Sequence, residues 1–257
     1  MKAIGRCVVL AILLFVSVTS RAEPTQLSEL NYYTEEYPPS NFIQRGELVG
    51  YAVDILQEAS RRVGEPVEVT KIKLGPWARG YRSTLTDDQG VLFATTRTDH
   101  REKLFNWVGP ISDIKVVVLA RKEDNIVIND PLDMANYIIG VIRDDIGEQS
   151  LLELGIPRNA MQEASYVTTL AEQLKKKRID LLAYDENAAY WWASQVAVEG
   201  DTFEPVYVLT EGHVYFAFNL NVPQSLLDKL QHGIDLIKSE RLDSGETVYQ
   251  SIMNKYR

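Results

Sequence analysis

Short apolar runs alternate with helical patterns along almost the whole chain, and this alternation constrains the fold more than any other feature. Strands are predicted around residues 30–32 and at 67–72, 90–95, 116–120, 137–142, 179–184 and 214–218. Helices are predicted at 52–63, 77–85, 149–154, 169–177, 186–192 and after Pro223. Such alternation is typical of an α/β architecture, in which helices flank a partly parallel sheet.

The first 22 residues have the pattern of a secretory signal peptide. Lys2 and Arg6 precede an apolar run at 8–18, and Ser20-Arg21-Ala22 forms a small-x-small cleavage site before Glu23. The run is shorter than the roughly 20 apolar residues of a membrane span. The single cysteine, Cys7, lies inside this segment, so the mature chain needs no disulfide. These features predict a soluble periplasmic protein.

Size and charge narrow the class of partner. The 257 residues are 45% hydrophobic and 25% charged, which suits one or two domains with real cores. Cleavage after residue 22 would remove three basic residues and no acid, so 27 basic and 36 acidic residues become 24 and 36. An acidic surface disfavours binding to nucleic acid or to an anionic membrane, so neither is expected as a partner.

The segment 93–110 is the richest in potential ligand contacts. The apolar run 91–94 leads into polar Thr95-Thr96-Arg97-Thr98, as at a strand end that opens into a cleft. Thr98 is predicted to cap a short helix with Arg101 in its first turn. The planar, permanently charged guanidinium of Arg101 suits a carboxylate.

This segment and several others resemble the bacterial extracellular solute-binding proteins of family 3, which capture polar amino acids. The resemblance is carried by Tyr37-Pro38-Pro39, Gly50-Tyr51-Ala52-Val53-Asp54, Trp77, Thr98, Arg101, Trp107, Pro110, Arg178-Ile179-Asp180 and Asp185. It implies a two-lobe type II periplasmic-binding-protein fold, in which each lobe is a mixed sheet flanked by helices. It also implies two hinge crossings, near 112–115 and 209–212. The expected lobes are 23–113 with 211–257, and 114–210.

The resemblance also implies a function. The expected role is periplasmic capture of a small zwitterionic or carboxylate solute in the interlobe cleft for ABC-type import. The expected partners are that ligand and an inner-membrane ABC permease, the expected state is a monomer, and neither cofactor nor metal is expected. The alternatives are a sensory module of the same fold and, less expected, a secreted dehydratase-like enzyme.

Six positions match ligand-binding positions of the family: Tyr37, Trp77, Ala94, Thr96, Arg101 and Asp185. The match implies that Arg101 binds the ligand carboxylate and Asp185 the ammonium. Thr96 would offer a hydroxyl or amide and Ala94 a backbone group. Tyr37 and Trp77 would sandwich the ligand side chain.

Five of these six positions also have a structural alternative. Arg101 can form a surface salt bridge with Glu102 or Asp99, and Asp185 can cap the helix that follows it. Tyr37 and Trp77 can be core or lobe-edge aromatics, and Thr96 a strand-end hydroxyl. Strand alternation points Arg97 away from Thr96, which favours a structural salt bridge; in the cleft, Arg97 would instead suit a ligand with a second acidic group.

The loop Arg143-Asp144-Asp145-Ile146 departs from the family pattern. Amino-acid binders usually have a glycine and threonines here, which help to hold the ligand carboxylate. Acids at this place would repel a carboxylate, which argues against an ordinary amino acid bound in the usual way.

An enzymatic role has little support in the sequence. His100, His213 and His232 are scattered without metal-ligand spacing, and the mature chain has no cysteine nucleophile. The acidic pairs Asp144-Asp145 and Glu35-Glu36 are expected on solvated loops rather than in a catalytic site.

Overall fold

The structure is a computed structural model that describes residues 23–195 and 202–256. The predicted signal peptide at 1–22 lies outside these residues. Within the described residues, none of the helices combines the length and apolar character needed to cross a membrane.

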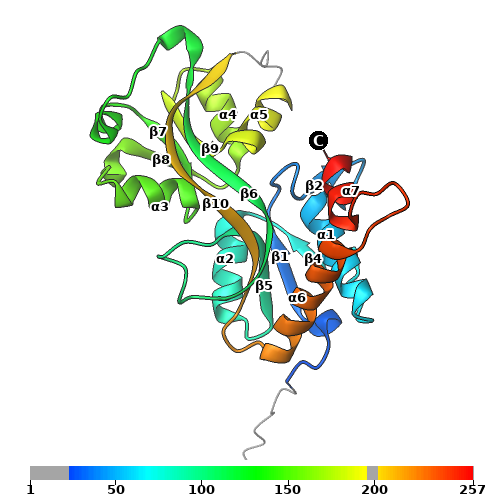
Figure 1. Ribbon diagram of the computed structural model, residues 1–257. Coiled ribbons are helices and arrows are strands. Elements are labelled where there is room, and N and C mark those ends of the chain that lie inside the picture. The colour runs from blue at the N-terminus through cyan, green and yellow to red at the C-terminus, as the bar shows by residue number, and fades with distance from the viewer. Residues whose placement is uncertain (1–22, 196–201, 257) are drawn as a thin grey trace, which may run out of the picture.

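Two lobes share one continuous sheet, as Figure 1 shows. The eight strands follow the order β4-β1-β5-β10-β6-β9-β7-β8. The outer strands of each half are parallel, whereas β10 and β6 pair antiparallel with each other and with their other neighbours. The two-lobe, mixed α/β fold predicted from the sequence is therefore confirmed.

The strands and helices have the following bounds. The strands are β1 (Asn31–Thr34), β2 (Phe42–Gln44), β3 (Glu47–Val49), β4 (Ile72–Leu74), β5 (Gly90–Thr96), β6 (Asn106–Arg121), β7 (Ile139–Ile142), β8 (Met161–Ala164), β9 (Leu181–Asp185) and β10 (Phe203–Phe218). The helices are α1 (Tyr51–Arg62), α2 (Trp77–Thr86), α3 (Ile146–Glu153), α4 (Val167–Lys175), α5 (Glu186–Gln195), α6 (Gln224–Ser239) and α7 (Val248–Lys255).

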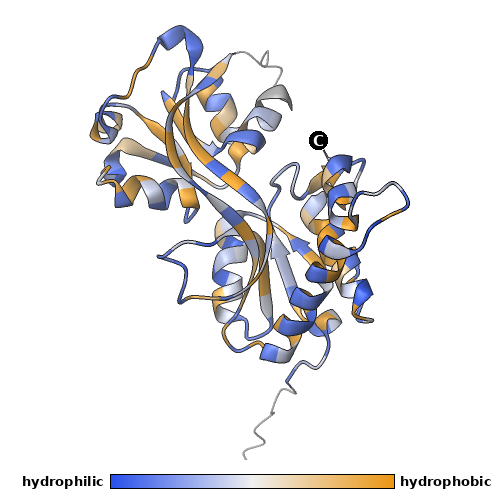
Figure 2. Cartoon of the chain, viewed as in Figure 1, coloured by the Kyte–Doolittle hydropathy of each residue, from blue (hydrophilic) through white to orange (hydrophobic). Residues whose placement is uncertain are grey.

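Helices cover both faces of the sheet in each lobe (Figure 1). In the first lobe α2 packs on β1 and β5, and α1, α6 and α7 pack together on the other side. In the second lobe α3 lies on one face, with α4 and α5 on the other. Figure 2 shows apolar residues concentrated on the strands and hydrophilic residues along loops and outer helix faces. The strands β5 and β9 are buried along their whole length, so both of their faces are in the core.

Three local predictions were wrong. Residues 69–71 form a 3-10 turn, so β4 begins only at Ile72 and not at 67. Helix α4 starts at Val167 after Tyr166, which places Thr169 inside the helix rather than at a capping box. The segment after Thr98 is a turn and not a helix, although the amide of Arg101 donates to Thr98 Oγ1 at 3.3 Å, as a cap would.

The two predicted crossing segments pair with each other in β6 and β10. Lys115 is the ladder partner of Glu211, and Asp113 is the partner of His213. The imidazole Nδ1 of His213 lies 2.8 Å from Asp113 Oδ1. The lobe boundaries predicted from the sequence fall inside these two strands, which run from one lobe into the other. We retain those boundaries as a prediction.

Gly50 provides a test of the packing at the start of α1. Its φ is 134°, and a Cβ atom at this position would lie 2.1 Å from the backbone oxygen of Ser40. We expect Gly50→Ala to lower the free energy of unfolding by about 2 kcal/mol, because the backbone must move to relieve the contact. The control Gly46→Ala, also at positive φ but with open space around it, should cost about 1 kcal/mol. Urea denaturation of both variants measures the difference, and equal losses would contradict the packing argument.

Candidate functional site

A small cavity lies between the lobes where several strands end. It is lined by Glu35, Tyr37, Trp77, Ala94, Thr96, Ile114, Asp145, Ile146, Tyr184 and Asp185, and we call it the inner cavity. The residues that line it come from the segment after β1, from the ends of β5 and β9, and from the starts of α2 and α3. In open α/β sheets, ligands bind at the carboxyl ends of the strands. Five of the six predicted site residues therefore line one cavity, and the sixth, Arg101, lies beside it.

The inner cavity is nearly filled by its own walls. Its free volume is about 10 Å³, room for about one water molecule. A wider groove of about 1000 Å³ adjoins it through Tyr37 and Asp185 and runs between α5 and α7. A ligand the size of an amino acid therefore requires the lobes to separate before it can reach the inner cavity.

Arg101 is completely buried, so a surface salt bridge with Glu102 or Asp99 is excluded. Its Nε donates to Gln149 Oε1 at 3.0 Å, its Nη1 to the backbone oxygen of Thr96 at 3.3 Å, and its Nη2 to the backbone oxygen of Asp144 at 3.3 Å. The rings of Trp77 and Tyr81 lie 5.2 and 5.4 Å from its Cζ. One lobe thus supplies the guanidinium, and the other supplies two of its acceptors.

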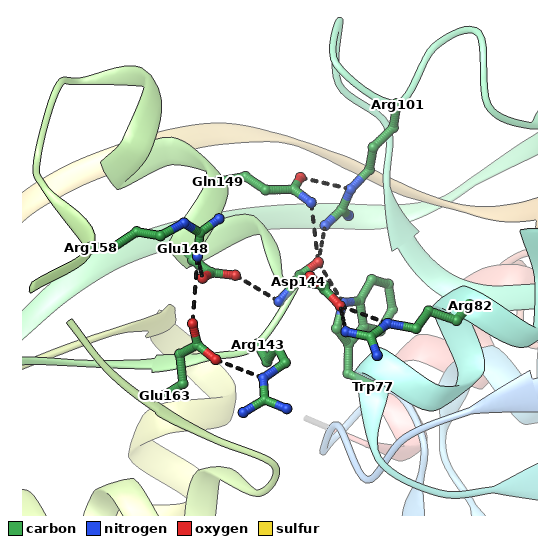
Figure 3. Close-up of polar contacts among 9 residues, drawn as sticks. All are labelled: Trp77, Arg82, Arg101, Arg143, Asp144, Glu148, Gln149, Arg158 and Glu163. Carbon is green, nitrogen blue, oxygen red and sulfur yellow. Dashed lines mark hydrogen bonds and ion pairs between the residues drawn. The ribbon is translucent and has the colours of Figure 1, made fainter.

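Asp144 is the centre of the contact between the lobes, as Figure 3 shows. Its backbone oxygen also accepts from the indole nitrogen of Trp77 at 3.0 Å, and its carboxylate accepts from Nη2 of Arg82 at 2.7 Å. Within the second lobe, the amide of Asp144 donates to Glu148 Oε2 at 2.7 Å. Asp144 has a φ of 60°, and both its carbonyl group and its side chain face the first lobe.

Three carboxyl groups line the inner cavity. Burial raises the pKa of Asp185 to about 6, although the amide of Ala188 lowers it by donating to Oδ1 at 2.8 Å. Burial also raises the pKa of Asp145, while the charge of Arg101 lowers it. Burial and the charge of Asp145 raise the pKa of Glu35, again against Arg101. The expectation that Glu35 and Asp145 lie on solvated loops was wrong.

Two tyrosine hydroxyls lie among these carboxyl groups. The rings of Tyr37 and Tyr184 meet edge to face with centroids 6.0 Å apart. Burial raises the pKa of both hydroxyls, and the charge of Asp185 raises them further. The buried hydroxyl of Tyr184 has no hydrogen-bond partner among the described residues. It therefore offers an unused polar atom at the wall of the inner cavity.

The predicted structural salt bridge of Arg97 is confirmed. Its Nη2 lies 2.6 Å from Glu102 Oε1, and its guanidinium lies 5.8 Å from the ring of Trp107 and 5.4 Å from that of Tyr215. Asp185 also caps α5, since it accepts from Ala188 in the first turn. That capping is compatible with a position at the cavity wall.

The family model of the bacterial extracellular solute-binding proteins, family 3, matches residues 31–255. The chain belongs to this family. The solute-binding protein is 23% identical over 227 residues to a probable histidine-binding protein of Campylobacter jejuni, covering 86% of this chain and 81% of that protein.

Solved structures of low sequence identity share the fold. An ancestral arginine-binding protein bound to arginine has a TM-score of 0.73 at 20% identity, covering 90% of this chain and 99% of that one. The arginine-, lysine-, histidine-binding protein of Geobacillus stearothermophilus has a TM-score of 0.70 at 18% identity, covering 88% and 94%. A histidine kinase sensor domain with similarity to periplasmic binding proteins reaches 0.75 at 18%, covering 90% and 96%.

Sequence reasoning missed three residues of this solute-binding protein's candidate site, namely Glu35, Gln149 and Tyr184. It placed the loop with Asp145 beside the expected ligand carboxylate but assigned Asp145 no role. Asp145 had a usable signal, because it stands directly before a helix, where a carboxylate is favoured by the exposed amides. Glu35 had a weaker signal, since it directly follows a strand and stands two residues before Tyr37. Gln149 and Tyr184 carried none, because a helix surface and a buried strand are their ordinary environments.

Proposed function

We propose that this solute-binding protein captures a small organic cation in the inner cavity. Amino acids with a basic side chain are members of that class. The observation that carries the proposal is the charge of the cavity wall: Glu35, Asp145 and Asp185 line it, and Arg101 lies beside it. Burial strengthens Coulomb attraction, so a ligand with an ammonium or guanidinium group is favoured over a neutral or anionic one.

The wall suits an organic cation better than a metal ion. Within the part of the chain that the structure describes, no cluster of three or more Asp, Glu, His or Cys side chains has the geometry to hold a metal. Tyr37, Trp77 and Tyr184 contribute aromatic surface, which packs on carbon and attracts organic cations. The related proteins named for binding arginine, lysine or histidine support the same ligand class.

Capture is proposed to occur in the periplasm, after removal of the signal peptide, and to feed an ABC permease in the inner membrane. Asp185 is the proposed ammonium ligand, and Tyr37, Trp77, Ala94 and Thr96 are proposed to line the bound solute. The protein would bind as a monomer and return its ligand chemically unchanged. Mass spectrometry of ligand recovered after incubation tests the absence of turnover.

A thermal-shift panel of cationic, neutral and acidic amino acids and amines tests the ligand class. At a concentration 100-fold above Kd, a ligand adds about 2.7 kcal/mol of apparent stability, which raises the Tm by roughly 5–10 °C. We expect shifts of this size only with cations. Shifts confined to neutral or acidic solutes would contradict the proposal. If a cation raised the Tm of Asp185→Asn as much as that of the wild type, the inner cavity would be excluded as the site.

A further inference from the structure

Arg101 has little capacity left for a carboxylate ligand. Three of its five N–H groups already point at Gln149, Thr96 and Asp144, and two aromatic rings lie over its Cζ. Burial raises the pKa values of both Glu35 and Asp145, and the charge of Arg101 acts on both carboxyl groups against that rise. An additional anion in the inner cavity would share one buried guanidinium with two protein carboxyls.

The start of α3 is a second source of positive potential at the cavity, and Asp145 lies there. It is the residue directly before α3 (Ile146–Glu153), and its backbone is extended, as at a helix N-cap. The exposed amides and the dipole of a helix start attract an anion. The amide of Ile146 lowers the pKa of the Asp145 carboxyl, although this side chain makes no capping hydrogen bond to the first turn of α3. The protein's own carboxylate therefore lies at the helix start and within range of the charge of the guanidinium.

We propose that Asp145 takes the place of a ligand carboxylate, so that the cleft prefers an amine or guanidine without a carboxylate over the matching amino acid. This inference rests on the proposed function, because it specifies which organic cation the inner cavity holds. Loss of the carboxylate leaves the ligand with net positive charge, which the three carboxyls of the wall then balance.

The hydroxyl of Tyr184 is an independent indication of a ligand rich in N–H donors. It is buried, has no partner among the described residues, and lies close enough to Glu35, Asp145 and Asp185 to feel the charge of all three. A hydroxyl in that place can accept a hydrogen bond from an ammonium group while its own proton turns to a carboxylate. The ligand would supply the partner that the protein lacks.

Matched pairs that differ only in the carboxylate test the inference. Isothermal titration of the mature protein would compare agmatine with arginine, cadaverine with lysine, putrescine with ornithine and histamine with histidine. We expect at least one amine to bind at least 10-fold more tightly than its amino acid. Tighter binding of the amino acid in every pair would overturn the inference and leave the proposed function standing. A panel in which no cation binds would overturn both.

The variant Asp145→Asn provides a second test of the inference. Asparagine keeps the helix-capping ability and the volume of the side chain but removes its charge. We expect the variant to lose at least 10-fold in affinity for the amine and to gain at least 10-fold for the amino acid. The control is Asp99→Asn, which removes an exposed carboxylate of the first lobe and should leave the preference unchanged. An unchanged preference in folded Asp145→Asn would overturn the inference; if that variant does not fold, the wild-type pairs still decide.

Discussion

Replacing Asp185 by asparagine is expected to weaken binding of the cationic ligand at least 100-fold and, at the same time, to stabilise the ligand-free protein at pH 7. The loss of affinity follows because a buried charge partner is removed, an effect of about 3–5 kcal/mol in other buried pairs. The gain in stability follows because the protein no longer has to bury an ionised carboxyl. Asparagine can still accept from the amide of Ala188, so the start of α5 keeps its cap.

The raised pKa of Asp185 determines how its contribution to stability changes with pH. The pKa of Asp185 is raised by burial from 3.8 to about 6, so the folded state holds this proton more tightly than the unfolded state. Its contribution favours folding at pH values below about 4 and is lost as the pH rises through about 6. A shift of about two units corresponds to about 3 kcal/mol.

Urea denaturation of the wild type and of Asp185→Asn between pH 4 and pH 8 measures this contribution. We expect the variant to exceed the wild type by about 1–3 kcal/mol at pH 7 and the difference to vanish near pH 4. Titration calorimetry with the best ligand then measures the loss of affinity. A variant that is less stable than the wild type at pH 7 would contradict the burial argument.

Replacing Arg101 by methionine is expected to destabilise the protein by about 3–5 kcal/mol. Methionine preserves much of the side-chain volume but removes the guanidinium donor to Gln149 Oε1 and to the backbone oxygen of Thr96. It also removes one of the three donors to the backbone oxygen of Asp144. It also removes the positive charge that stabilises the ionised forms of Glu35 and Asp145. Unsatisfied buried acceptors and unpaired buried acids both cost stability.

Arg97→Met is the matched control, four residues earlier. The exposed ion pair of Arg97 with Glu102 should contribute less than about 1 kcal/mol. Denaturant unfolding of both variants measures the difference. The double variant Arg101→Met with Asp145→Asn should lose less than the sum of the single losses, because the two groups interact. Equal losses in Arg101→Met and Arg97→Met would contradict the role assigned to the buried guanidinium.

The sequence predicted the architecture because most of its elements have strong patterns. The continuous apolar runs that became β5 and β9 and the amphipathic spacing of α1 and α6 depend only on local periodicity and burial. Elements with weak patterns were missed. Strands β2 and β3 have three residues each, most of them exposed or half-buried, and β8 has no buried residue. For such segments the pairing partner, and not the local pattern, decides the structure.

The site was predictable in part for a related reason. Arg101 and Asp185 were identified from a resemblance, and the structure places Asp185 at the wall of the inner cavity and the buried Arg101 beside it. The sequence could not show that Asp145 and Glu35 would share the charge of Arg101, because that depends on how closely two lobes approach. Nor could it show that Asp144 uses its backbone oxygen to meet Trp77 and Arg101, since every residue carries a carbonyl.

The junction between the lobes has a mechanical consequence. It is not a pair of loose connections but a two-stranded ribbon, in which β6 and β10 are hydrogen-bonded from Arg121 with Phe203 to Asn106 with Phe218. Register shifts interrupt the ladder between Pro205 and Tyr207 and between Val208 and Thr210, where local twist is easier to change. Opening of the cleft therefore requires a change in the twist of this ribbon, and the interrupted ladder positions are the places where that change costs least.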